Sequence, residues 1–222
     1  MDAVGLVLAA GAGRRLGMGE PKAFLPLGDA PILVWAVRSA LACPSVGSLV
    51  VTAPAGFEDE ARSALAEFGS ALRVVTGGDT RQGSVRAALE HVAADAPFVV
   101  IHDAARPFAS PELFTRVLEA VEGDAAGALP ALPVADTVKQ VADGWVTATL
   151  PRNDLVLVQT PQAFRSDPLR ESHRLVTSQD LTDDAAVLER AGYRVRAIAG
   201  DPTNVKITTM LDLVVARERV GA

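Results

Sequence analysis

Short apolar runs alternate with stretches of helical spacing along most of this chain, and this alternation limits the possible folds more than any other feature. Strands are predicted for residues 4–9, 49–53, 72–75, 98–101, 125–132, 156–159 and 194–199. Helices are predicted for residues 31–42, 58–68, 80–92, 111–121 and 169–176, and for two segments that begin after Thr182 and at Met210. Such alternation indicates a parallel sheet. The chain is therefore predicted to be an α/β protein: a single Rossmann-like domain over residues 1–222, with a mainly parallel twisted sheet flanked by helices.

One segment breaks this alternation of strands and helices. Polar and apolar residues alternate through residues 136–150, with Asp143 and Gly144 in the middle, and this dipeptide is typical of a tight β-hairpin turn. We therefore predict a protruding β-arm at about residues 134–151. An isolated hairpin is only marginally stable in water, so the arm needs a packing partner. A second subunit, giving a homodimer through the arm, is the preferred interpretation, and folding onto the chain's own sheet is the alternative.

Charge and composition exclude several classes of protein. The net charge is −6 and no basic run stands out, which argues against a nucleic-acid partner but not against a small anionic ligand. Cys43 is the only cysteine, so no intrachain disulfide and no cysteine-based zinc site can form. No run of apolar residues has the length of a membrane span, and Asp2 has the wrong charge for a signal peptide. These observations predict a cytoplasmic protein without a membrane partner.

The loop after the first predicted strand, "LAAGAGRRLGMGEPKAFLPLG" at residues 8–28, is rich in glycine and cations. It lacks the G-x-x-x-x-G-K-[ST] string of a P-loop. Its glycines do not fit the G-x-G-x-x-G dinucleotide fingerprint, and no acidic residue ends the second strand, which disfavours a hydride-transfer enzyme. A loop whose amides and cations, Arg14, Arg15 and Lys22, wrap a triphosphate fits better. A mobile surface loop with ordinary arginines is the alternative.

The choice of cations also carries information. The chain has 18 arginines but only three lysines, at positions 22, 139 and 206. Where arginine serves as the general cation, a lysine can mark a place that needs a compact ammonium group. Each lysine is therefore worth following, with chance placement as the alternative for any one of them. Lys139 lies on a predicted hairpin strand and is expected to face solvent.

Six strings together resemble one family of nucleotidyltransferases. They are "LAAGAGRRLG…PKAFLPLG", "GGDTRQGSV" at 77–85, "HDAARP" at 102–107, "QTPQAF" at 159–164, "LTDDA" at 181–185 and "NVKIT" at 204–208. In this order they are similar to the 2-C-methyl-D-erythritol 4-phosphate cytidylyltransferase family of the non-mevalonate isoprenoid route. The resemblance covers nearly the whole chain. It implies that the phosphate of a polyol phosphate attacks the α-phosphorus of CTP and releases pyrophosphate.

The resemblance also implies roles at the nucleotide. Arg15 and Lys22 would carry the negative charge of the transition state, and Asp103 would bind a divalent cation, Mg²⁺ by preference. The nucleotide would be held by Ala9, Ala10, Gly11, Gly13, Gly78, Asp79 and Ser84. For Asp103 the alternative is a cap of the next turn, and for Ser84 a hydroxyl in the first turn of a helix. His102 is expected to be structural.

The same resemblance implies roles for residues at the polyol phosphate, the acceptor of CMP. Arg152 and Lys206 would position the attacking group, so the catalytic set is Arg15, Lys22, Arg152 and Lys206. The substrate-binding set is Asp103, Ala104, Arg106, Asp136, Thr137 and Thr160. If the arm crosses a dimer, its residues among these would serve the neighbour's site. Thr182 is expected to cap a helix that Asp183 and Asp184 begin.

Two other functions compete with this interpretation. A ribitol 5-phosphate cytidylyltransferase would use the same chemistry on a different polyol phosphate. A nucleotide-binding module without catalysis would be expected to have lost Lys22 or Asp103, and both are present.

Overall fold

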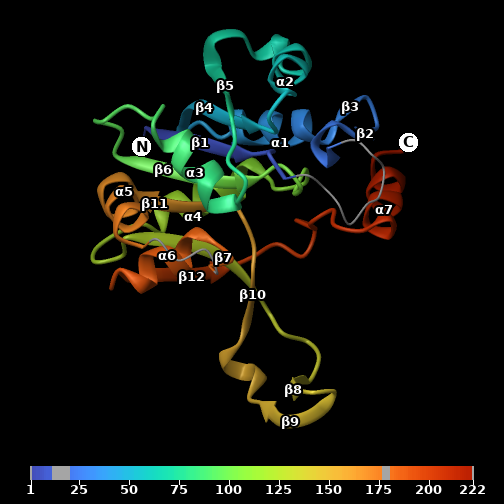
Figure 1. The fold of residues 1–222 in the computed structure, drawn as a ribbon, viewed down its shortest axis with the longest axis vertical. Coiled ribbons are helices and arrows are strands. Elements are labelled where there is room, and N and C mark those ends of the chain that lie inside the picture. The colour runs from blue at the N-terminus through green and yellow to red at the C-terminus, as the bar shows by residue number, and fades with distance from the viewer. Residues whose placement is uncertain (1, 12–20, 177–180, 222) are drawn as a thin grey trace.

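The computed structural model describes residues 2–11, 21–176 and 181–221, and in this part of the chain the main feature is an eight-stranded sheet (Figure 1). Its strands are β1 Ala3–Leu8, β4 Val46–Ala53, β5 Leu72–Thr76, β6 Phe98–Asp103, β7 Gly127–Pro133, β10 Val156–Val158, β11 Gln162–Arg165 and β12 Val195–Ala199. The order is β10-β7-β11-β6-β1-β4-β5, with β12 also paired to β7. Two small sheets are formed by β2 Pro26–Leu27 with β3 Ala30–Pro31, and by β8 Val138–Ala142 with β9 Trp145–Leu150.

Helices connect most of these strands. They are α1 Ile32–Leu41, α2 Glu58–Ala64, α3 Arg81–Leu89, α4 Pro111–Glu119, α5 Ser166–Leu175, α6 Asp184–Arg190 and α7 Met210–Val220. Short 3₁₀ helices are η2 Lys22–Phe24, η3 Ala66–Ala71 and η4 Arg152–Asp154. The predicted helix over residues 58–68 is wrong in its second half, because α2 ends at Ala64 and a 3₁₀ segment with Gly69 at φ 54° follows.

The two faces of the sheet are covered by different helices. Side chains of α1, α2 and α4 form one apolar cluster with alternate residues of β1, such as Ala3 and Val7. Side chains of α3, α5 and α6 form another with Leu6 of the same strand. Because successive side chains of a strand point to opposite faces, the continuous apolar run of β1 serves both clusters. The predicted α/β architecture, a mainly parallel sheet between layers of helices, is confirmed.

One half of the sheet is parallel. β1 pairs in parallel with β4 and β6, and β4 pairs in parallel with β5. Leu8 at the end of β1 lies beside Thr52 on one side and Asp103 on the other. The carboxyl ends of these strands therefore meet at one edge of the sheet, where ligands of open α/β sheets bind.

The other half of the sheet contains antiparallel strand pairs, whose orientation was not predicted from the sequence. β11 lies antiparallel between β6 and β7, and β10 pairs antiparallel with β7. No strand was predicted at residues 162–165. The strand is short, and it is positioned by Phe164, which is fully buried and whose ring packs directly over the backbone of Gly127.

The hairpin stands apart from the body of the protein (Figure 1). Within the described chain, β8 and β9 pair only with each other, and the turn between them holds Asp143 at φ 50° and Gly144 at φ 81°. Positive φ at both central residues is the turn geometry that Asp-Gly favours in hairpins. The predicted β-arm is thus confirmed, and folding onto the chain's own sheet is not what the structure shows.

Among the described residues, no helix combines the length and the apolar composition needed to cross a membrane.

Candidate active site

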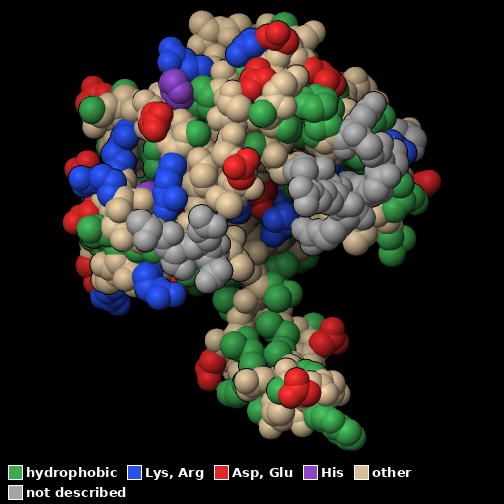
Figure 2. Space-filling view, viewed as in Figure 1, with side chains coloured by type: hydrophobic (Ala, Val, Ile, Leu, Met, Phe, Trp, Pro, Cys, Tyr) green, Lys and Arg blue, Asp and Glu red, His purple; other side chains and the backbone are tan. Residues whose placement is uncertain are grey.

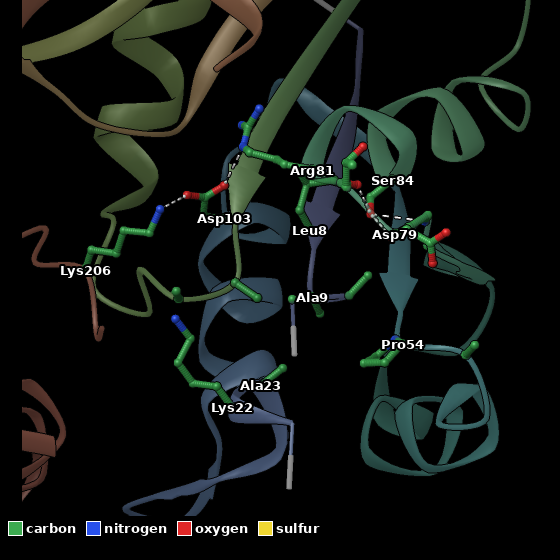
Figure 3. A pocket seen from close by; sticks show the side chains of 18 of the residues that line it. Leu8, Ala9, Lys22, Ala23, Pro54, Asp79, Arg81, Ser84, Asp103 and Lys206 are labelled. Carbon is green, nitrogen blue, oxygen red and sulfur yellow. Dashed lines mark hydrogen bonds and ion pairs between the residues drawn. The ribbon is translucent and has the colours of Figure 1, made fainter. Parts of the chain in front are cut away.

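A pocket of about 580 Å³ opens at the carboxyl ends of β1, β4, β5 and β6 (Figure 3). Each of these strands continues into a loop that lines it. The residues are Leu8, Ala9, Ala10 and Gly11 at and after the end of β1, Pro54 and Ala55 after β4, Gly77, Gly78, Asp79 and Thr80 after β5, Arg81 and Ser84 at the start of α3, and Asp103, Ala104 and Ala105 at and after the end of β6. Lys22, Ala23, Lys206 and Thr208 complete the wall. The parallel register of the strands is therefore what brings these distant segments together.

One side of the pocket is a tight loop held against the start of α3. The Ser84 hydroxyl accepts a hydrogen bond from the Gly78 backbone N–H at 3.2 Å, and Thr80 caps α3 by accepting from Gly83 N. A Cβ at Gly78 would lie 2.7 Å from the carbonyl carbon of Gly83, so this close approach requires glycine. The loop presents backbone groups of the kind that can read the polar edge of a nucleobase.

The opposite side carries ammonium groups (Figure 3). Lys22 begins η2 and donates from Nζ to the backbone carbonyl of Ile207 at 2.7 Å. Lys206 lies in the loop before α7, and its Nζ is 2.6 Å from Oδ2 of Asp103. That loop is fixed by Ile207, which is fully buried and donates its N–H to the carbonyl of Ala105 at 2.8 Å. Two of the three lysines of the chain therefore meet at one end of the pocket.

Asp103 is the acidic centre of this cationic side. Oδ1 faces Arg81 Nε at 3.3 Å and Oδ2 faces Lys206, and the side chain is only 12% exposed. Burial by itself would raise the pKa of this carboxyl, but the positive charges of Arg81 and Lys206 outweigh it and hold the pKa well below its usual range. Asp103 is therefore ionised throughout the physiological pH range.

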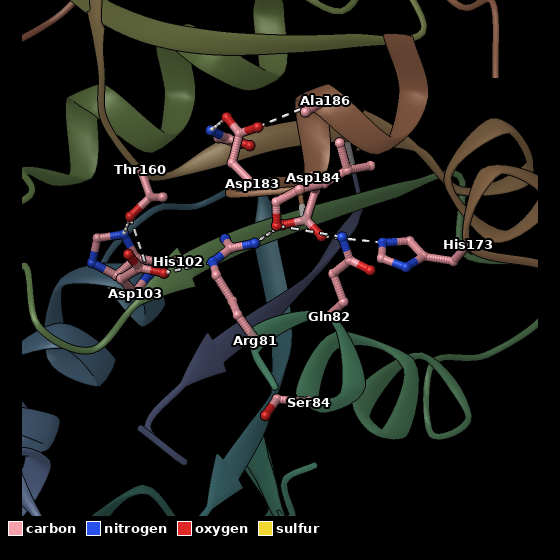
Figure 4. A network of polar contacts seen from close by, with 12 residues as sticks. Arg81, Gln82, Ser84, His102, Asp103, Thr160, His173, Asp183, Asp184 and Ala186 are labelled. Atoms are coloured by element: carbon pink, nitrogen blue, oxygen red, sulfur yellow. Dashed lines mark hydrogen bonds and ion pairs between the residues drawn. The ribbon is translucent and has the colours of Figure 1, made fainter. Parts of the chain in front are cut away.

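Arg81 belongs to a buried network that the sequence analysis missed (Figure 4). Its Nη1 is 2.6 Å from Oδ2 of Asp184, whose side chain is fully buried, and His173 Nε2 lies 3.1 Å from Oδ1 of the same carboxylate. Burial opposes the charge on Arg81, but the carboxylates of Asp184 and Asp103 outweigh it and raise its pKa further. The string "GGDTRQGSV" contained Arg81, yet nothing local marked its partner 103 residues away.

The same region corrects the prediction for the start of α6. Thr182 does not cap this helix; Asp183 does, by accepting a hydrogen bond from Ala186 N at 3.0 Å. Gln162 donates to the other oxygen of Asp183 at 2.9 Å, which fixes its rotamer. Asp184 is consequently turned inward to Arg81 instead of serving as a solvated charge at the start of the helix.

A neutral histidine supports Asp103 from behind. His102 Nδ1 contacts the Thr160 hydroxyl at 3.1 Å and Nε2 contacts the carbonyl of Arg106 at 3.0 Å. The Thr160 oxygen accepts from the backbone N–H of Asp103 at 3.0 Å. Burial lowers the pKa of His102 from its ordinary 6.5 to about 4, so the ring is uncharged at neutral pH. This agrees with the structural role predicted for it.

A second hollow of about 360 Å³ adjoins the first. It shares Arg81, Asp103 and Lys206 with the main pocket and adds Arg106 and Thr160 among its lining residues. Arg106 donates from Nη1 to the carbonyl of Asn204 at 2.8 Å and from Nη2 to that of Val158 at 3.3 Å. The Arg106 guanidinium thus joins the end of β10 to the loop that contains Asn204. The Thr160 hydroxyl contacts the Asp103 backbone N–H and the His102 ring.

Apart from Arg106 and Thr160, which line the second hollow, the predicted site residues fall into three groups. The main pocket brings together Ala9, Ala10, Gly11, Lys22, Gly78, Asp79, Ser84, Asp103, Ala104 and Lys206. The arm keeps three others, Asp136, Thr137 and Arg152, away from the pocket of their own chain, where Arg152 donates to the carbonyl of Ala135. Gly13, Arg14 and Arg15 lie outside the described residues, so the roles given to them stay predictions.

Comparison with known proteins identifies the family. Residues 3–221 match the family described as "IspD: 2-C-methyl-D-erythritol 4-phosphate cytidylyltransferase". Proteins named 2-C-methyl-D-erythritol 4-phosphate cytidylyltransferase are similar over almost the full length. That of Rhodococcus opacus (strain B4) is 46% identical over 98% of this chain and 94% of its own. That of Saccharopolyspora erythraea is 44% identical over 97% of this chain and 98% of its own. The crystal structure of the Thermus thermophilus protein, 35% identical, matches with a TM-score of 0.81 over 100% of both chains. This chain therefore belongs to the 2-C-methyl-D-erythritol 4-phosphate cytidylyltransferase (IspD) family.

Proposed function

We propose that this protein transfers CMP from CTP to 2-C-methyl-D-erythritol 4-phosphate and releases pyrophosphate. The observation that carries the proposal is the pocket at the carboxyl edge of the sheet, where a backbone loop on one side faces Lys22, Arg81 and Lys206 on the other. A nucleotide needs both sides of this pocket: neutral donors and acceptors for the base, and positive charge for the phosphates. Membership of the family supports this choice of donor and acceptor.

Base recognition is assigned to the loop side of the pocket. Cytosine offers an exocyclic amine donor and ring acceptors, which match the carbonyls of Ala9 and Gly78 and the backbone N–H groups of Ala10 and Asp79. Ser84 acts here through the loop, because its hydroxyl holds Gly78. A loop held in this way keeps its hydrogen-bonding groups in fixed positions for the base.

Catalysis is assigned to positioning and charge. When an acceptor phosphate attacks the α-phosphorus, negative charge accumulates around one phosphorus atom, and fixed cations stabilise that state. Lys22 lies on the side of the loop after β1 and Lys206 lies beside Asp103. Lys22 would bind the phosphates of CTP, and Lys206 would orient the attacking phosphate. Arg15 is proposed to act together with Lys22.

A divalent cation is a further part of the proposal. Among the described residues, no three His, Cys, Asp or Glu side chains gather closely enough to hold a metal ion by themselves. One carboxylate in a pocket suited to a triphosphate does fit Mg²⁺, which takes most of its ligands from phosphate oxygens and water. Asp103 would hold the ion, and the ion would neutralise charge on the triphosphate. Loss of turnover in EDTA and recovery with Mg²⁺ is the expected result; full turnover in EDTA would contradict this part.

The acceptor distinguishes the proposed reaction from its main alternative. Purified protein is incubated with CTP, Mg²⁺ and either 2-C-methyl-D-erythritol 4-phosphate or ribitol 5-phosphate, and pyrophosphate release is followed. We expect kcat/KM to be at least about 100-fold higher for methylerythritol phosphate. A higher kcat/KM for ribitol 5-phosphate would make that polyol phosphate the acceptor in place of methylerythritol phosphate. Absence of pyrophosphate release with both, despite CTP binding, would support a binding module and overturn the enzymatic proposal.

A homodimer formed through the arm is also proposed. The arm exposes apolar side chains, seen as the green surface at its end in Figure 2, and Trp145 is 78% exposed. Arg152, Asp136 and Thr137 lie at its base, outside the pocket of their own chain, so they would complete the neighbour's site. Light scattering should give twice the chain mass for the intact protein and the chain mass after deletion of residues 138–149. An unchanged mass would remove the proposal.

Mixing two inactive variants tests the contribution of the arm to the neighbouring site. If Arg152 acts in the partner's site, mixed dimers of Arg152→Met and Lys206→Met chains contain one site with both changes and one intact site. After subunit exchange, about a quarter of the wild-type activity should return. No recovery in demonstrably mixed dimers would place Arg152 outside the neighbouring site. The cytoplasmic location and the absence of a nucleic-acid partner stay predictions from the sequence.

A further inference from the structure

A line of buried ionisable side chains runs from the pocket into the layer of helices (Figure 4). It begins at Asp103 at the end of β6, passes through Arg81 at the start of α3 and Asp184 at the start of α6, and ends at His173 of α5. The successive contacts are 3.3 Å, 2.6 Å and 3.1 Å. Asp103 and Arg81 line the pocket, whereas the inner members, Asp184 and His173, have no role in the proposed reaction.

Stability alone does not explain the inner part of this line. The side chain of Asp184 is fully buried, that of His173 is 3% exposed and that of Arg81 is 24% exposed. Charges removed from water are expensive, and a buried ion pair is often no more stabilising than apolar side chains of similar volume. Apolar residues would fill the space between α3, α5 and α6 equally well. A buried pair does, however, hold its partners in one geometry.

The contact with Asp184 fixes the orientation of the Arg81 guanidinium. A guanidinium has donors fixed in a plane, so a contact at one end sets the direction of the other. Arg81 uses Nη1 on Asp184 and Nε on Asp103. Asp184 is itself fixed through its second oxygen, which contacts His173. The orientation of Asp184 therefore sets the position of the nitrogen that meets Oδ1 of Asp103.

We propose that Asp184 is a positioning residue, which holds Arg81 so that the carboxylate of Asp103 keeps one orientation in the pocket. This inference rests on the proposed function, because it assigns a purpose to the orientation of Asp103. With Oδ1 on Arg81, Oδ2 faces Lys206 at 2.6 Å, so the position of this ammonium group depends on the same arrangement. Asp184 acts on the reaction only through Arg81 and does not touch substrate.

Two single variants separate positioning from charge. Asp184→Ala removes both acceptor oxygens, and Arg81→Lys keeps the positive charge but has one nitrogen, which cannot replace two fixed nitrogens of a plane. Both should lower kcat by about 10- to 100-fold, as a displacement of about 1 Å at a catalytic group does, with CTP affinity within about threefold of wild type. Wild-type kcat in Arg81→Lys would overturn the proposal.

The matched control removes a comparable set of contacts elsewhere on the same helices. Arg170 of α5 donates to the carbonyl of Leu89, the last residue of α3, and to the carbonyls of Val92 and Ala93 just beyond it. Arg170→Met should lower the thermal midpoint as Asp184→Ala does, yet leave kcat within about twofold. Rates are normalised to the number of CTP sites found by calorimetry, so that loss of folded protein is not read as loss of kcat. An equal fall in kcat for the control would show that loosening of this region is sufficient, and would overturn the positioning role.

A double variant tests whether Asp184 acts through Arg81. In an Arg81→Met background the link to Asp103 is already absent, so Asp184→Ala should lower kcat by no further factor above about two. Multiplication of the two single effects would contradict the proposed route. The double variant also removes both partners of the buried pair, which keeps the test usable if Asp184→Ala alone does not fold.

A crystal structure of the ligand-free Asp184→Ala protein gives a readout that needs no turnover. The separation of Arg81 Nε and Asp103 Oδ1 should exceed about 4 Å, where the intact protein has 3.3 Å. An unchanged separation would overturn the inference while the intact enzyme still transferred CMP. Absence of transfer by the intact enzyme would instead remove the proposed function and leave the structural result standing.

Discussion

His102 makes the stability of this fold depend on pH in a window that can be calculated. The ring is buried behind the pocket, between the Thr160 hydroxyl and the carbonyl of Arg106, and its centroid lies 5.1 Å from that of the Phe114 ring. Burial lowers its pKa from 6.5 to about 4. In the unfolded chain the imidazole is exposed and takes up a proton near pH 6.5. Between these two values the unfolded state therefore binds one proton more than the folded state.

The sign and the magnitude follow from this difference in bound protons. Stability falls as the pH drops wherever the unfolded state binds more protons, at up to about 1.4 kcal/mol per pH unit for one proton. The separation between 6.5 and about 4 corresponds to about 3 kcal/mol of unfolding free energy, a sizeable fraction of the total for a single domain. Asp103 and Asp184 have lowered pKa values in the folded protein, so they affect stability at a lower pH. Their ionised forms stabilise the folded state above about pH 3.8, and this stabilisation is lost only as the pH falls below that value.

Urea unfolding followed by circular dichroism between about pH 7.5 and pH 4.5 measures this loss. The wild-type protein should lose most of the roughly 3 kcal/mol in that range, since about 1.4 kcal/mol belongs to each unit of pH. His102→Gln should be less stable at neutral pH but almost independent of pH over the same range. If the variant keeps the wild-type slope, the proton is taken up by another group, and the neutral, buried state assigned to His102 is wrong.

Three further predictions concern the pocket and its supports. Lys206→Met removes the ammonium group 2.6 Å from Asp103 and should lower kcat by about 100-fold or more in a pyrophosphate assay, with CTP binding retained; a loss below about threefold would contradict its role. Ser84→Ala frees the loop at Gly78 and should raise the KM for CTP by about tenfold; an unchanged KM would remove Ser84 from base recognition. Asn204→Ala deletes a fully buried amide that donates a hydrogen bond to the backbone carbonyl of Thr160. This variant should lower the unfolding free energy measured in urea by about 1–3 kcal/mol. A change indistinguishable from zero would show that this amide is dispensable.

Local chemistry made some of the fold predictable. The helix predicted to begin at residue 111 does begin there, and the Ser110 hydroxyl caps it by accepting a hydrogen bond from Leu113 N at 3.3 Å. The turn at Asp143 and Gly144 was likewise predicted from two residues that tolerate positive φ. In both cases a few neighbouring residues contain the whole cause, so the sequence is sufficient to reveal it.

Long-range pairing was not predictable in the same way. Residues 162–165 form a strand because an open position exists between β6 and β7, and nothing in four residues announces an antiparallel neighbour. The cap of α6 was assigned to Thr182, since both Thr182 and Asp183 suit an N-cap; the contact from Gln162 decides for Asp183. Such choices depend on side chains that only the tertiary fold brings near.

The candidate site contains residues that the sequence predicts together and contacts that it does not predict. Pocket residues on separate loops were predicted together because parallel strands end at one edge, which a pattern of strands and helices already implies. The link from Arg81 to Asp184 crosses 103 residues and has no period or motif of its own. The residues of the arm were placed by resemblance alone, and only in the proposed dimer would a second chain bring them into a complete site.

The most direct test of the central claim is the rate of a single turnover in Lys22→Met. Lys22 lines the pocket, and in the proposed reaction its ammonium group stabilises charge on the phosphates as CMP moves between oxygens. With saturating CTP, Mg²⁺ and 2-C-methyl-D-erythritol 4-phosphate, the rate of product formation on the enzyme should fall by about 100-fold or more, equivalent to about 3 kcal/mol or more of barrier. A single-turnover rate equal to that of the wild-type protein would contradict the account.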